Sequence, residues 1–236
     1  MRLNKYIARA GISSRRKADE LVFNGRVRVN GNTVDHPGID IGKEDVVEVD
    51  GDVIKLEGKL VYYLLHKPLD YVTTVDDPHE KLQVVDLIDT KERIYPAGRL
   101  DKDSTGLLLL TNDGILTHRI THPRYGIKKT YDVLVSGHPS KKNISRLEKG
   151  IIIDDYLLNP CTIEGKATGK DTSSYFVTID EGRNRQIRKM FHRIGHPVIE
   201  LCRIQLGPLH LGNLAPGEYR ELKKNELKEL KEECYR

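Results

Sequence analysis

A polar loop in the middle of the chain carries three residues capable of chemistry, Arg99, Asp101 and Asp103. It is followed by an uninterrupted apolar run, residues 107–110, and then by the turn residues 112–114. So short a run between turn residues predicts a strand buried on both faces. A loop held against such a strand is rigid enough for catalysis, and a carboxylate beside an arginine stays ionised. The alternative is that the aspartates only cap backbone amides.

The same stretch resembles the central motif of the pseudouridine synthases, in particular the RsuA/RluB branch. The motif reads Gly-Arg-Leu-Asp-x-x-(Ser/Thr)-x-Gly-Leu-Leu-Leu-x-Thr-x-Asp-Gly, and it matches this chain from Gly98 to Gly114. The resemblance implies that Asp101 is the catalytic carboxylate. It also implies that Arg99 and Leu100 bind the substrate, with Arg99 holding a flipped-out nucleotide or filling the position that it leaves.

Two later motifs extend the resemblance. Lys129-Thr130-Tyr131 opens an alternating strand, and in RsuA-like enzymes a Lys-x-Tyr supplies the active-site tyrosine. Judged by pattern alone, Tyr131 is an ordinary packing aromatic. The run Gly-Arg-Asn-Arg-Gln-Ile-Arg leads into an amphipathic helix whose arginines, by pattern alone, form a solvated face. The resemblance implies that Arg188 pairs with the catalytic carboxylate, that Lys129 and Arg185 bind substrate, and that Leu201 lines a uracil pocket.

The basic charge is concentrated at the N-terminus. Residues 1–30 carry a net charge of +6, whereas the whole chain carries +4. Apolar spacing predicts two short helices there, followed by the strand 26–29 and a hairpin turn at Asn30-Gly31. The pattern resembles an S-four-type RNA-binding domain, although a solvated basic face is the alternative. The residues expected to contact RNA, mainly through phosphates, are Arg2, Lys5, Arg9, Ser14, Arg15, Arg16, Lys17 and Arg26.

Mixed helices and strands without regular alternation predict an α+β fold with a mainly antiparallel sheet. We expect an RNA-binding domain at residues 1–51, a linker at 52–60 and a catalytic domain at 61–236 that ends in a charged helix. Strands are expected at 62–65, 71–75, 131–136, 157–163, 175–179 and 197–204, and residues 83–88 fit either a helix or a strand.

Composition describes a soluble globular protein, with 38% hydrophobic and 31% charged residues. No apolar segment approaches a membrane span and the N-terminus lacks a signal-peptide core, so we expect a cytoplasmic protein with no membrane partner. The 3 cysteines are scattered, which predicts free thiols. We further expect a monomer.

Three patterns suggest cofactors, but each is incomplete. His118 and His122 have helical metal-ligand spacing without a third ligand, so zinc is not expected. Residues 165–171 echo a phosphate loop but are one residue short and end in Asp, which favours a turn. Asp101 and Asp103 would suit a magnesium nuclease, but nearby arginines would compete with the cation. No cofactor and no metal are expected, since conversion of uridine to pseudouridine is an isomerisation.

The combined patterns predict an enzyme that isomerises a specific uridine of ribosomal RNA to pseudouridine, acting on free RNA or a ribosome assembly intermediate. The residues 184–187 and the N-terminal motif resemble the RluB type, acting on 23S RNA, more than the RsuA type, acting on 16S RNA. The alternative is a non-catalytic RNA-binding assembly factor on the same fold. The joint presence of Asp101, Tyr131 and Arg188 favours the enzyme.

Overall fold

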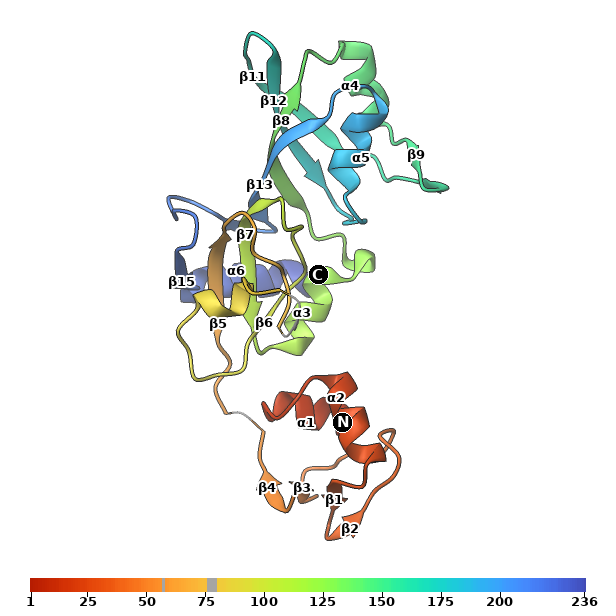
Figure 1. Ribbon diagram of the computed structural model, residues 1–236, viewed down its shortest axis with the longest axis vertical. Coiled ribbons are helices and arrows are strands. Elements are labelled where there is room, and N and C mark those ends of the chain that lie inside the picture. The colour runs from red at the N-terminus through yellow and green to blue at the C-terminus, as the bar shows by residue number, and fades with distance from the viewer. Residues whose placement is uncertain (57, 76–79) are drawn as a thin grey trace. The chain divides into compact units, whose positions relative to one another are not determined.

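A computed structural model describes residues 1–56, 58–75 and 80–236 (Figure 1). The chain forms two compact units, one of residues 1–60 with 91–93 and the other of residues 61–90 with 94–236. Each unit has its own hydrophobic core.

The N-terminal unit packs two helices on a small antiparallel sheet. Ser14 caps the second helix, because its hydroxyl accepts a hydrogen bond from the Lys17 amide at 3.2 Å. The helices are α1 (Leu3–Arg9) and α2 (Arg15–Phe23), and the strands, in the spatial order β2-β1-β3-β4, are β1 (Val27–Val29), β2 (Asn32–Thr33), β3 (Val47–Val49) and β4 (Asp52–Ile54). Residues 52–54, predicted as part of a linker, form strand β4. The turn at Asp50-Gly51 leads the chain back so that β4 pairs antiparallel with β3.

The second unit is built on one mixed sheet with the strand order β11-β12-β8-β13-β7-β5-β15. Its pairs are antiparallel except β13 with β7, where Cys202 lies opposite Thr105. The strands are β5 (Tyr62–Lys67), β6 (Tyr95–Pro96), β7 (Thr105–Thr111), β8 (Lys129–Ser136), β11 (Thr162–Thr168), β12 (Thr172–Ile179), β13 (Val198–Leu206), β14 (Leu209–His210) and β15 (Tyr219–Glu221); β9 (Ile152–Ile153) and β10 (Tyr156–Leu157) form a separate hairpin. The predicted α+β class is confirmed.

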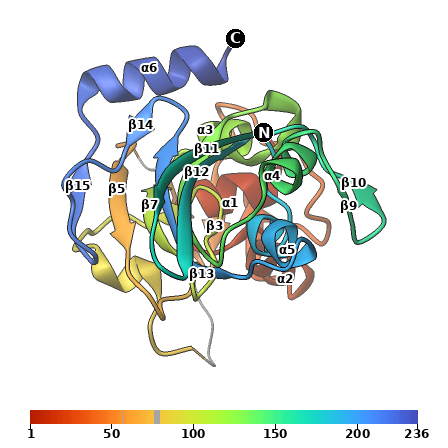
Figure 2. The same cartoon turned by 90° about the horizontal axis from the view of Figure 1, so that it is seen from above.

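Helices cover both faces of this sheet (Figure 2). Side chains alternate along β7, so Leu108 and Leu110 join one buried cluster and Leu107 and Leu109 join the other. The first cluster includes side chains of α4 (Lys141–Glu148) and α5 (Gln186–Arg193), and the second includes side chains of α3 (Gly114–Thr121) and α6 (Lys224–Cys234). Short 3-10 turns, η1 (Val84–Leu87) and η2 (Pro123–Tyr125), complete the unit.

Several local predictions hold and others do not. The strand at 107–110 is confirmed, with all four leucines fully buried. The strand predicted at 157–163 is interrupted, because β10 ends at Leu157 and β11 begins at Thr162. The strand predicted at 71–75 is wrong, because among the described residues its one β-pairing is a single bridge from Val72 to Gln83. The turn predicted at 165–171 is also partly wrong, because residues 165–168 belong to β11 and pair with β12.

Candidate active site

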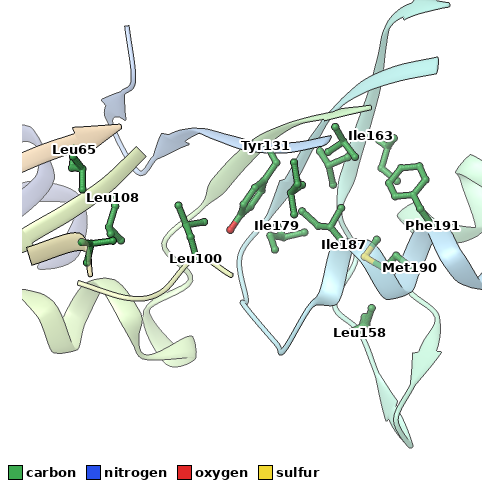
Figure 3. Close-up of a cluster of buried hydrophobic side chains, with 14 of the residues drawn as sticks. Leu65, Leu100, Leu108, Tyr131, Leu158, Ile163, Ile179, Ile187, Met190 and Phe191 are labelled. Carbon is green, nitrogen blue, oxygen red and sulfur yellow. The ribbon is translucent and has the colours of Figure 1, made fainter. Parts of the chain in front are cut away.

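Asp101 lies on the loop between β6 and β7, with its side chain 35% exposed. The preceding Leu100 is buried and joins the same cluster as Tyr131 (Figure 3). Thr73 binds both backbone polar groups of Leu100. Its Oγ1 donates to the Leu100 carbonyl at 2.7 Å and accepts from the Leu100 amide at 3.2 Å. The backbone at Asp101 is therefore fixed from the N-terminal side.

Lys67 fixes the loop from the other side, and sequence reasoning missed this residue. Its side chain is fully buried, and Nζ donates to the carbonyl oxygens of Ser104 at 2.7 Å, Pro68 at 2.9 Å and Lys102 at 3.4 Å. Burial lowers the pKa of Lys67 to about 8, while the neighbouring carboxylates, Asp101 among them, oppose this shift. The available signal was a lysine at the end of the strand Tyr-Tyr-Leu-Leu-His-Lys.

Gly106 places the loop against the sheet at the point where β7 begins. Its φ is +108°, and an added Cβ would lie 2.3 Å from the Arg203 carbonyl oxygen and 2.5 Å from the Arg203 nitrogen. No side chain fits in this approach of two strands, so the glycine of the motif is a packing requirement. The buried Arg203 also donates from Nε to the Leu107 carbonyl at 2.7 Å.

Two arginines of α5 reach the loop. Arg185, in left-handed backbone at the helix N-cap, donates two hydrogen bonds to the Asp103 carboxylate at 2.9 and 2.8 Å and lies 3.6 Å from Asp101 Oδ2. Arg188 donates to the Asp103 carbonyl at 2.6 Å and lies 3.4 Å from its carboxylate. Within the described residues no ion pair joins Arg188 to Asp101. The ion pair and the shortest hydrogen bond of Arg188 in this loop go to Asp103, and the predicted pairing of Arg188 with Asp101 stays a prediction.

Hydrogen bonds and burial together shift the pKa values of the charged groups in this cluster. Hydrogen bonds from Arg185 lower the pKa of the Asp103 carboxyl, and the same contact raises the pKa of Arg185. Burial is the largest influence on Arg188 and lowers its pKa, whereas the charges of Asp103 and Asp101 act in the opposite direction. Two guanidinium groups and one buried ammonium group therefore surround the loop that carries Asp101.

Tyr131, Lys129 and Leu201 come from neighbouring strands. The buried Tyr131 side chain extends between Leu100 and Ile179 in Figure 3, and Leu201 belongs to the same cluster. Lys129 Nζ donates to the Ile127 carbonyl at 2.9 Å, and burial lowers its pKa to about 8. Arg99 is exposed. The structure thus places Tyr131 beside Leu100, puts Leu201 in the same buried cluster, and leaves Arg99 exposed.

The predicted RNA-binding residues lie on the N-terminal unit, and not all are equally available. The exposed cations of its helices are Lys5, Arg9, Arg15, Arg16 and Lys17. Arg26 instead donates two hydrogen bonds to the Asp50 carboxylate, at 2.7 and 2.6 Å. Arg2 donates to the Gly38 carbonyl, and the Ser14 hydroxyl is engaged as a helix cap.

His118 and His122, at the C-terminal end of α3, pack against an aromatic ring. Among the described residues no group of three His, Cys, Asp or Glu side chains is arranged to hold a metal ion. His118 and His122 instead pack with Tyr125, at ring-centroid distances of 5.8 and 6.0 Å. Within residues 1–56, 58–75 and 80–236, no helix has the length and apolar character needed to cross a membrane.

Comparison with known proteins adds the following. The family model for RNA pseudouridylate synthase matches residues 61–193, and the model for the S4 domain matches residues 1–47. The chain is 43% identical over 233 residues to ribosomal large subunit pseudouridine synthase B of Bacillus subtilis, covering 98% of this chain and 95% of that protein. It is 42% identical over 234 residues to an uncharacterized RNA pseudouridine synthase of Aquifex aeolicus, covering 98% and 93%. A crystal structure of a pseudouridylate synthase matches with a TM-score of 0.70 and 31% identity, covering 98% of this chain and 99% of that one.

Proposed function

Since the chain belongs to the RNA pseudouridine synthases of the RsuA/RluB type, we propose that it isomerises one uridine of ribosomal RNA with Asp101 as its catalytic carboxylate. The observation that carries the assignment is that side chains hydrogen-bond the loop backbone on both sides of Asp101, Thr73 before it and Lys67 after it. Neither holds the Asp101 carboxylate itself, so that group is left for a substrate.

The reaction breaks the bond between ribose C1′ and uracil N1 and forms a bond between C1′ and C5. The base rotates between the two steps, N1 gains a proton and C5 loses one, so atoms and electrons balance without a co-reactant. In our proposal the Asp101 carboxylate acts as nucleophile or base on the nucleoside. The uridine must leave its stack to reach that carboxylate.

The surrounding residues receive roles consistent with their contacts. Arg185, 3.6 Å from Asp101, is the cation that keeps this carboxylate ionised. Arg188 acts through Asp103, which it holds in place, and is therefore a positioning residue. Tyr131 stacks on the flipped uracil and assists removal of the C5 proton, and Arg99 holds the RNA at the vacated position.

We propose the large-subunit RNA as the substrate. The Bacillus subtilis relative is named as a large-subunit enzyme, and its 43% identity extends over 98% of this chain. Lys5, Arg9, Arg15 and Arg16 of the N-terminal unit would contact RNA phosphates. The proposal includes a monomeric cytoplasmic enzyme that acts on ribosomal RNA or an assembly intermediate.

The decisive experiment is tritium release from 23S and 16S transcripts that carry 5-tritiated uridine, with EDTA present. Wild type is expected to release tritium from 23S RNA alone, and Asp101→Asn to release none while binding RNA with unchanged affinity. Asp103→Asn is the matched control: it removes a neighbouring carboxylate, so turnover should fall but remain measurable. Full activity of Asp101→Asn would refute the assignment. Release from neither RNA, with binding intact, would favour a non-catalytic assembly factor.

A further inference from the structure

We propose that the segment from α3 to the start of β8 is a second RNA-binding surface, which holds the phosphate backbone of the RNA next to the target uridine. This inference rests on the proposed function and extends it, because it states how the catalytic unit itself grips the substrate. We call this surface the α3–β8 patch. It consists of the cations Arg119, Arg124 and Lys128 and the rings of His118, His122 and Tyr125.

Among the described residues, no acidic side chain forms an ion pair with the cations of the patch. Arg124 and Lys128 are exposed and Arg119 is half-buried. Of the ion pairs between described residues, none involves these three side chains, in contrast to Arg26, which Asp50 neutralises. A surface of uncompensated cations attracts polyanions and releases counterions when phosphates bind.

An aromatic ring orders the two arginines. The Arg119 and Arg124 guanidinium carbons lie 4.9 and 4.5 Å from the centroid of Tyr125, and Arg119 also lies 4.2 Å from the centroid of Tyr235. Arg119 further donates to the Cys234 carbonyl at 3.0 Å. Tyr125 itself packs against the buried cluster beneath α3. Guanidinium groups held in this way lose less conformational entropy when they bind a phosphate, which raises affinity.

The segment that carries the patch is connected along the chain to elements of the candidate active site. At one end, a side chain at Gly98 would meet Thr121 of α3 at 3.5 Å, and Gly98 directly precedes Arg99. At the other end, Lys128 directly precedes Lys129, which opens the strand that carries Tyr131. In this proposal, RNA that flanks the uridine bound at Asp101 continues past Gly98 towards α3 and the patch.

RNA is the partner that this chemistry fits. Arginines supply forked donors for phosphate oxygens, and exposed imidazole and guanidinium planes stack on unpaired bases. The helices α3 and α6 pack together beneath the patch, so its groups sit on a rigid support (Figure 2).

The test uses the full chain with Arg124→Gln and Lys128→Gln combined, and the 23S transcript with 5-tritiated uridine as probe. Filter binding over a series of salt concentrations gives Kd and its salt slope, and single-turnover tritium release at saturating enzyme gives the rate of the bound complex. The salt slope is the slope of log Kd against the logarithm of the salt concentration. Loss of two phosphate contacts should lower this slope by about 1.4–1.8 and raise Kd by about 25- to 60-fold at 0.1 M salt. The rate at saturation should stay within about twofold, since these residues bind and do not react.

The matched control is Lys141→Gln with Lys142→Gln, two exposed lysines on α4, which packs against β11 at the far edge of the sheet. The control should bind like wild type, and both proteins should melt like wild type. A folded Arg124/Lys128 variant with unchanged Kd and salt slope would overturn the inference. If wild type releases no tritium, the proposed function fails, whereas the binding comparison still decides whether the patch contacts RNA.

Discussion

Replacing Lys67 by Met tests whether one buried ammonium group holds the loop that carries Asp101. The substitution keeps the length and apolar stem of the side chain but removes the donor shared by the carbonyl oxygens of Pro68, Lys102 and Ser104. Nothing else is removed from the site, and Asp101 is retained. The variant therefore separates the position of the carboxylate from its presence.

The two energetic consequences of Lys67→Met oppose each other. The buried Ser104 carbonyl and the partly buried Pro68 and Lys102 carbonyls lose their donor at a cost of about 1–3 kcal/mol each, and the 3.4 Å bond to Lys102 lies at the weak end, so about 3–6 kcal/mol is lost. Burial lowers the pKa of Lys67 from 10.5 to about 8, an electrostatic cost of about 3 kcal/mol at pH 7 that a neutral side chain removes. The net destabilisation is about 0–3 kcal/mol, which a domain of this size tolerates.

Activity should fall far more than stability. A loop displaced by about 1 Å costs about 100-fold in rate. We expect single-turnover tritium release to fall by at least that factor, while the melting temperature falls by less than about 10 °C. The control is Lys102→Met in the same loop, since Lys102 is exposed and pairs with Glu80 at 2.9 Å, an interaction of small value. A Lys67→Met variant within threefold of wild-type activity would refute the reasoning.

Two further predictions concern pH and packing. Folded protein releases the Lys67 proton near pH 8 and unfolded chain near 10.5, so in this window the unfolded state binds more protons and this group's contribution to stability rises with pH. Activity should nevertheless fall above about pH 8 without unfolding, because the neutral Lys67 amine has fewer donors than the ammonium group. A Lys129→Gln variant should show the same fall of kcat/KM at alkaline pH as wild type. If the Lys129→Gln variant lacks this fall, Lys129 and not Lys67 is the group responsible. Gly106→Ala should cost about 2–4 kcal/mol in chemical denaturation, because the added methyl group meets the Arg203 backbone. Gly126→Ala, also at positive φ but with open space around it, should cost only about 1 kcal/mol, and equal losses would contradict the packing argument.

Local structure was predictable where neighbouring residues decide it. Ser14, Asp113 and Ser140 each cap the helix that follows, because a short oxygen-bearing side chain reaches the free amides one turn ahead. The run 107–110 had to be a buried strand, since an unbroken apolar stretch of that length has no polar face to expose. The failed strand at 71–75 shows the limit, because a strand also needs a partner along its length and residues 71–75 have one bridge.

The sequence by itself determined the family motifs and the order of the units, and the resemblance that those motifs carry implied Asp101 as the candidate carboxylate. Only the tertiary structure decided which cations approach the loop that carries Asp101. Arg185 and Lys67 approach the loop from 82 and 37 residues away along the chain, and Arg188 contacts Asp103, whereas the family resemblance implies Asp101 as its partner. Such contacts arise when strands and helices distant in sequence pack together, and no local pattern encodes the distances between them.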